Sequence, residues 1–147
     1  MGSYALNYGG FEIPGVDLAD ATTHVVHVRS DEHEGVMLVV YRSRIALGRS
    51  LRDVVAARIA EEMTRLSGYV VLENADVEWG GKHAVDVAAR YRHEGRVMYV
   101  RQGHVQHTDC CITFAMSGKL ASRAAIDAWL EAAMTSFRIR NDVEFDV

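Results

Sequence analysis

The chain of 147 residues is poor in cysteine and proline and has no long hydrophobic run. Its two cysteines, Cys110 and Cys111, are adjacent, a spacing poorly suited to an ordinary intrachain disulfide. We therefore expect reduced thiols and a fold that no disulfide holds together. The single proline, Pro14, is expected to end a short N-terminal hairpin.

Two further absences restrict the possible partners. No apolar run approaches the roughly 20 residues that cross a bilayer, and the N-terminus lacks the pattern of a secretory signal. Lys and Arg number 16 against 20 Asp and Glu, which gives a net charge of −4, and no basic stripe with interleaved aromatic residues occurs. These features argue against nucleic acid and anionic membranes as partners. We expect a cytoplasmic protein that is not itself inserted in a membrane.

The length suits one domain, residues 1–147, with a core of ordinary size. Glycine pairs occur at Gly9-Gly10 and Gly80-Gly81, but they stand between strand-like segments and do not form a phosphate-binding loop. The acidic loop residues lack the spacing of a calcium site. No cofactor and no catalytic residue is therefore predicted.

The most informative stretch, 95–118, predicts two long strands joined by a polar turn at Gln106–Asp109. In the first strand, alternation places Val97, Tyr99 and Arg101 on one face, and Met98, Val100, Gln102 and His104 on the other. The second strand divides into Cys111, Thr113 and Ala115 against Cys110, Ile112, Phe114 and Met116. Neither strand separates apolar from polar faces. We expect both faces to be covered by helices, a second subunit or a ligand.

The rest of the chain predicts an antiparallel meander with two main helices packed on it, an α+β fold. One helix should begin at the N-cap Ser50 and stop near Gly68, and Ser122 should cap the other. The expected strands are an edge hairpin at Tyr4–Ile13, Thr22–Arg29, a fully buried Val36–Arg42, and a pair at Tyr69–Trp79 and Lys82–His93 around Gly80-Gly81.

A chemical site is one possibility for the segment His104-x-x-His107-x-x-Cys110-Cys111. It contains nitrogen and sulfur ligands suited to zinc, and a histidine beside a thiol can activate a nucleophile. However, His104 and His107 face opposite sides of one strand, as do the two cysteines. Turn histidines and small buried thiols are the simpler interpretation, so no metal site is predicted.

Gln102 lies on the same strand face as Met98 and Val100, where an amide is costly to bury without a partner. It either reaches a neighbouring backbone group or satisfies polar groups of a helix bound in an apolar groove. Val25, with Thr23 and His27, can contribute to the same groove. The pairing of the strands that would place these residues on one face cannot be deduced from the sequence.

Four segments carry a resemblance to a known group of proteins. They are Tyr4–Tyr8 leading to Ile13-Pro14, Asp20-x-Thr22-x-His24-Val25-Val26, Tyr99-x-Arg101-Gln102 and Trp129…Ser136-Phe137. With these, the chain resembles the DcrB-like, PsbP-like group and, within it, the Eag chaperones of bacterial type VI secretion.

The resemblance implies a homodimer that binds the hydrophobic N-terminal segments of a toxin effector carrying a spike-tip domain. It places client binding at Val25, with its strand neighbours Thr23 and His27, and at Gln102, whose strand face also holds Met98 and Val100. The alternative is a small-ligand or structural module of the same fold, and an enzyme built on the His and Cys residues comes third. His24 and His27 make the proposed groove more polar than an aliphatic one, so acid is expected to weaken client binding.

Overall fold

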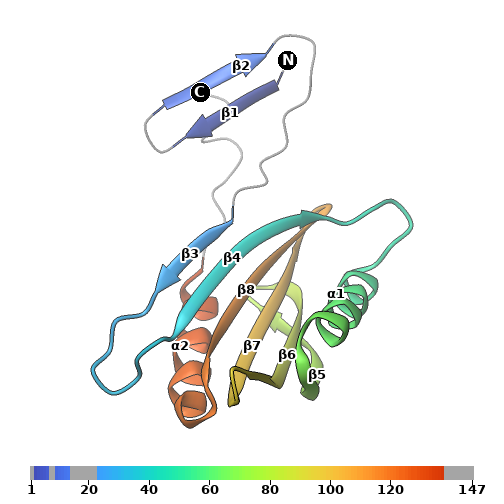
Figure 1. Cartoon of the computed structure of the whole chain (residues 1–147). Helices are drawn as coiled ribbons and strands as arrows, with labels where there is room; N and C mark the ends of the chain where they lie inside the picture. The colour runs from blue at the N-terminus through green and yellow to red at the C-terminus, as the bar shows by residue number, and fades with distance from the viewer. Residues whose placement is uncertain (1, 7–8, 14–22, 138–147) are drawn as a thin grey trace.

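The computed structural model describes residues 2–6, 9–13 and 23–137, and its elements form an α+β fold (Figure 1). The strands are β1 (Gly2–Leu6), β2 (Gly9–Ile13), β3 (His24–His27), β4 (Met37–Arg44), β5 (Ser67–Trp79), β6 (Lys82–His93), β7 (Arg96–His107) and β8 (Cys110–Lys119). Helix α1 spans Leu51–Arg65, and α2 spans Arg123–Ser136 after a short 3-10 turn at Leu120–Ser122. This architecture confirms the fold class expected from the sequence.

The main sheet is antiparallel, with the strand order β3-β4-β8-β7-β6-β5. Strands β5 to β8 follow one another as the predicted meander, and Gly80 and Gly81 make the first turn with positive φ angles of 59° and 78°. These angles suit glycine, which has no Cβ to clash. The hairpin of β7 and β8, which the stretch 95–118 forms, occupies the centre of the sheet.

The N-terminal hairpin forms, but it does not extend the main sheet as an edge. β1 and β2 pair antiparallel in a separate two-stranded sheet, with Leu6 opposite Gly9. The prediction of an edge position was therefore wrong. Pro14, and the C-terminal segment 138–147, lie outside the described residues.

Helix α2 covers one face of the main sheet and builds the larger core. Its buried residues Ile126, Leu130 and Met134 pack with Val36, Ala84, Ala88, Tyr99, Val105, Phe114 and Met116. The sequence predicted that the side chain of Ser122 caps this helix, and that part of the prediction was wrong. Ser122 stands at the N-cap position, but its hydroxyl lies 2.9 Å from Nδ1 of His33 and makes no capping bond.

Helix α1 lies on the opposite face and packs against β5, β6 and β7. Ser50 and Asp53 form the predicted cap as a reciprocal capping box. The smaller core contains Ile45, Leu51, Val55, Val85, Val87 and Cys111. The helix ends at Arg65 rather than at Gly68, which lies in β5 with a φ of 63°.

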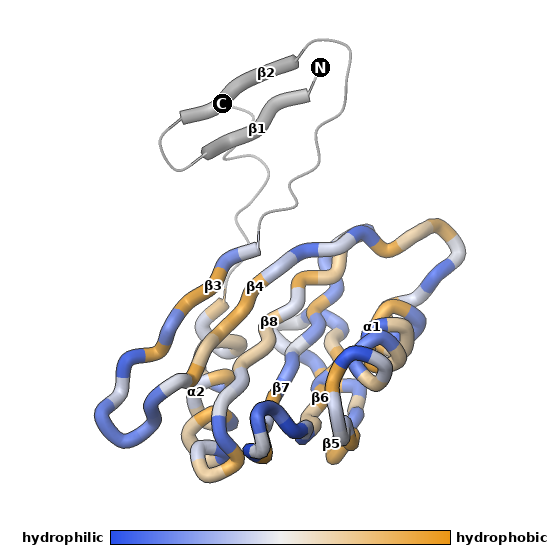
Figure 2. Tube along the Cα trace, in the orientation of Figure 1, coloured by the Kyte–Doolittle hydropathy of each residue, from blue (hydrophilic) through white to orange (hydrophobic). Residues whose placement is uncertain are grey.

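Helix α1 packs over β5, β6 and β7, so the part of the same sheet face formed by β3 and β4 is less covered. Strand β4 was expected to be buried on both faces, but residues 37–41 are only half-buried, and β3 is exposed throughout. Figure 2 shows apolar residues along both strands. The apolar run at Val36–Arg42 thus identified a strand correctly and its burial wrongly.

Candidate functional site

The register of the sheet shows which candidate residues share a face. Val25 lies opposite Val39, Val39 opposite Ala115, and Ala115 opposite Gln102. Directly opposed residues in antiparallel strands point to the same side of the sheet. Val25 and Gln102 are therefore in one row across four strands. Because Gln102 also lies opposite Val87 in the core beneath α1, this row is on the α1 face.

A second row runs parallel to the first and contains His27, Met37, Ser117 and Val100. Met98 is two residues before Val100 and has the same parity. Thr23 precedes β3 and is two residues before Val25. The register thus places Val25 and His27 on the same sheet face as Met98, Val100 and Gln102, which the sequence alone could not decide. His24 lies opposite Val40, on the other face.

The two rows combine exposed and buried positions. Val25 is 52% exposed at the edge, Met37, Val39, Ala115 and Ser117 are half-buried, and Val100 and Gln102 are buried near α1. We call these residues, together with His27, the open face. It is an apolar surface that starts at the edge strand and ends beneath a helix.

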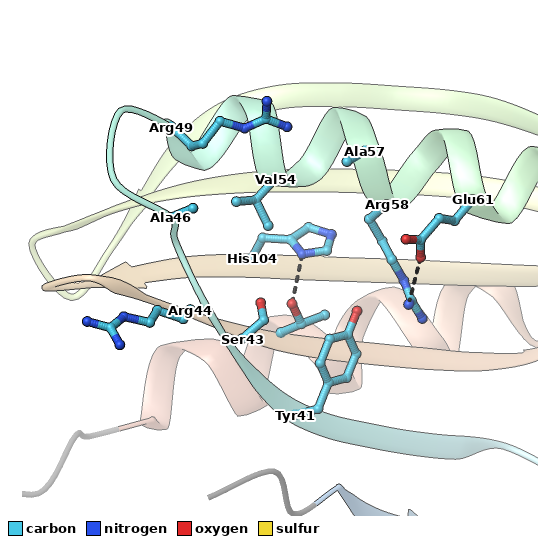
Figure 3. Close-up of a pocket in the computed structure, with 11 residues that line it drawn as sticks. Tyr41, Ser43, Arg44, Ala46, Arg49, Val54, Ala57, Arg58, Glu61 and His104 are labelled. Atoms are coloured by element: carbon cyan, nitrogen blue, oxygen red, sulfur yellow. Dashed lines mark hydrogen bonds and ion pairs between the residues drawn. The ribbon is translucent and has the colours of Figure 1, made fainter. Parts of the chain in front are cut away.

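A cavity of about 360 Å³ lies between α1 and the sheet, next to the open face (Figure 3). The sheet contributes Tyr41, Ser43, Thr113 and His104 to its walls, and α1 contributes Val54, Ala57, Arg58 and Glu61. Tyr41, Thr113 and His104 form the next row of the same sheet face. The cavity therefore continues the open face under the helix.

Polar contacts connect this cavity to Gln102. His104 is 1% exposed, with Nδ1 2.9 Å from Thr113 Oγ1 and Nε2 3.0 Å from Gln102 Oε1. Burial, aided by the nearby charge of Arg58, lowers the pKa of His104 to about 4. The imidazole is therefore neutral at neutral pH. The side-chain oxygen of Gln102 thus has a side-chain partner, His104, rather than the backbone partner considered from the sequence.

Arg58, on α1, places a positive charge next to Tyr41 in the wall of the cavity. Its guanidinium lies 5.2 Å from the centre of the Tyr41 ring, and Nη2 lies 3.1 Å from Glu62 Oε1. Tyr41 lies directly opposite Thr113 in the register of β4 and β8. Burial raises the pKa of Tyr41, an effect that Arg58 partly offsets. The tyrosine hydroxyl is therefore protonated at neutral pH.

Tyr41, Arg58 and Thr113 were not among the site residues expected from the sequence. Alternation along Val36–Arg42 gives Tyr41 the parity of Val39, so that signal was present in the sequence. Arg58 follows from no local pattern, because the packing of α1 on the sheet brings it to Tyr41.

The four residues considered for zinc or nucleophilic chemistry have separate surroundings. His107 Nδ1 lies 3.1 Å from Lys82 Nζ, whereas His104 contacts Thr113 and Gln102. Burial raises the thiol pKa of both Cys110 and Cys111, which disfavours a reactive thiolate. In the described part of the chain, no three His, Cys, Asp or Glu side chains are grouped so as to hold a metal ion.

A family model described as DcrB matches residues 9–136, which is most of the chain. The chain belongs to the DcrB family. This confirms the broader resemblance drawn from Tyr99-x-Arg101-Gln102 and the other three segments. Among the helices that the structure describes, none has the length and apolar character to span a bilayer. No curated protein matches the chain.

Solved structures support the same fold for this DcrB-family chain. A Pseudomonas aeruginosa protein of unknown function, PA94, has a TM-score of 0.78 at 19% identity, with 95% of this chain and 96% of that chain covered. Cyanobacterial PsbP from Synechocystis has a TM-score of 0.60 at 14% identity, covering 94% and 91%. LpqN of Mycobacterium tuberculosis, involved in cell envelope biogenesis, reaches 0.55 at 11% identity, covering 75% and 79%.

Proposed function

We propose that this DcrB-family protein is a cytoplasmic, homodimeric chaperone that shields the hydrophobic N-terminal transmembrane segments of a type VI secretion effector. It then aids loading of the effector onto the secretion spike. The observation that carries the proposal is the open face, because an apolar surface on a sheet with one side left uncovered needs a partner. The Eag resemblance supplies the identity of that partner.

The dimensions of the open face suit such a client. Strand β4 has eight residues, which corresponds to about 26 Å at the usual rise of a strand. A transmembrane helix has an apolar length of about 30 Å. A helix lying along β4 would therefore replace lipid with Val25, Met37 and Val39 over most of that length, and Gln102 would provide a polar contact of the kind that such helices form with one another.

Neighbouring valines of β3 provide a matched test. Val25 is 52% and Val26 49% exposed, but they point to opposite faces. We expect Val25→Asp to weaken binding of a carrier protein fused to an apolar segment of about 20 residues by at least about tenfold, because a carboxylate would be buried against the segment. Val26→Asp should bind like the wild type.

Isothermal titration measures both affinities, the carrier without the segment is the negative control, and light scattering of the free protein tests the dimer. Equal losses in the two variants would show that binding does not use the open face. Failure of the wild type to bind the fusion, or a monomer in solution, would contradict the chaperone proposal.

The cavity favours a second candidate, a small-ligand module of the same fold. Its volume of about 360 Å³ is at the lower end of the range for small-molecule sites, and its wall combines apolar side chains with Tyr41 and Arg58. A thermal-shift screen of small apolar carboxylates tests this candidate. A hit that Arg58→Met abolishes, in a protein that does not bind the apolar fusion, would favour it over the chaperone.

A further inference from the structure

The cavity beneath α1 lies at one end of the open face. Along β4 the residues that point to this face are Met37, Val39, Tyr41 and Ser43, spaced about 7 Å apart. The first two belong to the open face, and the last two line the cavity. A segment that lies along β4 over the open face therefore reaches the cavity near one of its own ends.

The wall of the cavity holds more positive than negative charge. It contains three arginines and one glutamate, which are Arg44, Arg49, Arg58 and Glu61. Arg44 is paired with Asp109 at 3.3 Å. The side chain of Arg49 forms no hydrogen bond or salt bridge with a described residue, and Asp53, on which its charge acts, is already held by Ser50 in the capping box. Arg49 is therefore available to an anion at the cavity.

Arg58 also has donors that its neighbours do not use. Figure 3 shows its side chain extending from α1 toward Tyr41. Nη2 lies 3.1 Å from Glu62 Oε1, but Nη1 has only a 3.6 Å contact with Glu61, whose side chain is 70% exposed, and such a pair is weak. Nε is buried without a partner in the part of the chain that the structure describes. A carboxylate in the cavity can therefore take over Nη1 while Glu62 keeps Nη2.

The rest of the wall favours a single negative charge on an apolar body. Ala46, Val54 and Ala57 provide aliphatic contacts. Burial lowers the pKa of His104 to about 4, so its imidazole is neutral at neutral pH and adds no positive charge. Glu61 repels a second negative charge. A carboxylate on an aliphatic chain therefore suits the cavity better than a phosphate dianion.

We propose that the cavity is a carboxylate-binding site, and that its occupant is a glutamate or aspartate side chain at one end of the apolar segment of the client. Arg58 and Arg49 bind this carboxylate through charge-assisted hydrogen bonds. The client inference rests on the proposed function, whereas the site itself rests on the cavity. A small apolar acid such as hexanoate offers the same chemistry, and it is the alternative source of the carboxylate.

Carrier fusions that differ in one residue test the client. Each holds an apolar segment of about 20 residues, with glutamate or glutamine at successive positions over the terminal helical turn at either end. At one end we expect glutamate to bind about three- to tenfold more tightly than glutamine, which has the same shape without the charge. At the other end the two should bind equally. Isothermal titration measures the ratio of the two affinities, and equal binding at both ends would overturn the proposal.

Arginine variants assign the preference to this cavity. Arg58→Met should reduce it to less than about twofold, and Arg49→Met, at an exposed position that is less demanding on the fold, should reduce it in the same direction. Arg52→Met is the matched control, because Arg52 lies on the same helix but bonds to Asp76 at 2.9 Å and does not line the cavity. It should keep the wild-type ratio. Equal ratios in Arg49→Met and Arg52→Met, or a preference that survives Arg58→Met, would overturn the assignment.

Hexanoate separates the two sources of the carboxylate. If wild type binds the glutamate and glutamine fusions equally at both ends, the client inference fails and the chaperone proposal stands. If it binds neither fusion but binds hexanoate, and Arg58→Met abolishes that binding, the chaperone proposal fails and a small acid is the ligand of the cavity. If neither the fusions nor hexanoate bind, the chaperone and the carboxylate site fail together.

Discussion

The buried imidazole of His104 should make the stability of the protein depend on pH. Its pKa is about 4 in the folded protein because burial disfavours the charged form. In the unfolded chain an ordinary histidine pKa of about 6.5 applies. The unfolded state therefore binds a proton first as the pH falls, so stability is fully present above about pH 6.5 and is lost toward pH 4.

The size of this effect follows from the two pKa values. Lowering the pH from about 7.5 to about 5 should cost about 2 kcal/mol of unfolding free energy through His104 alone, and the full loss should approach about 3 kcal/mol near pH 4. The exposed carboxylates Asp53, Asp76 and Asp109 have lowered pKa values, so they titrate below this window and add little within it.

Urea denaturation at each pH measures the unfolding free energy. His104→Gln replaces the imidazole with an amide that does not titrate, so the unfolding free energy of this variant should fall about 2 kcal/mol less than that of wild type between about pH 7.5 and pH 5. His93→Gln, which removes an exposed histidine, is the control and should keep the wild-type slope. Parallel curves for wild type and His104→Gln would refute the argument that His104 is buried as a neutral group.

Two substitutions, Arg101→Met and Gly103→Ala, test packing on the α2 face, and Arg123→Met is the control for the first. Arg101 bonds to Asp86 at 2.9 Å and 2.5 Å, with side-chain exposures of only 15% and 12%, so Arg101→Met should leave a buried carboxylate unpaired and cost about 3 kcal/mol. Arg123→Met, at an exposed position 4.0 Å from Asp127, should cost less than about 1 kcal/mol in the same denaturation assay, and equal losses would contradict this account. Gly103→Ala should lower stability by about 1–3 kcal/mol, because its Cβ would lie 2.8 Å from Trp79 Cζ3 and 3.2 Å from Met134 Sδ; an unchanged denaturation midpoint would contradict that close packing.

Local signals in the sequence determined most of the secondary structure and the fold class. The capping pair Ser50 and Asp53, the glycine turn at Gly80-Gly81 and the alternation of the central hairpin each act over a few residues, so they can be read without knowing the fold. The Tyr99-x-Arg101-Gln102 segment and its companions indicated the DcrB-like group, which the family match confirms. The Eag role remains a proposal.

The tertiary structure decided what the strands face. Which side Val25 shares with Gln102 depends on the pairing of β3 with β4 and of β4 with β8, which brings together strands far apart in the sequence. Shifting either register by one residue would place these side chains on opposite faces. The partial cover by α1, which leaves β4 half-buried and brings Arg58 to Tyr41, likewise follows from long-range packing, and no local sequence pattern encodes it.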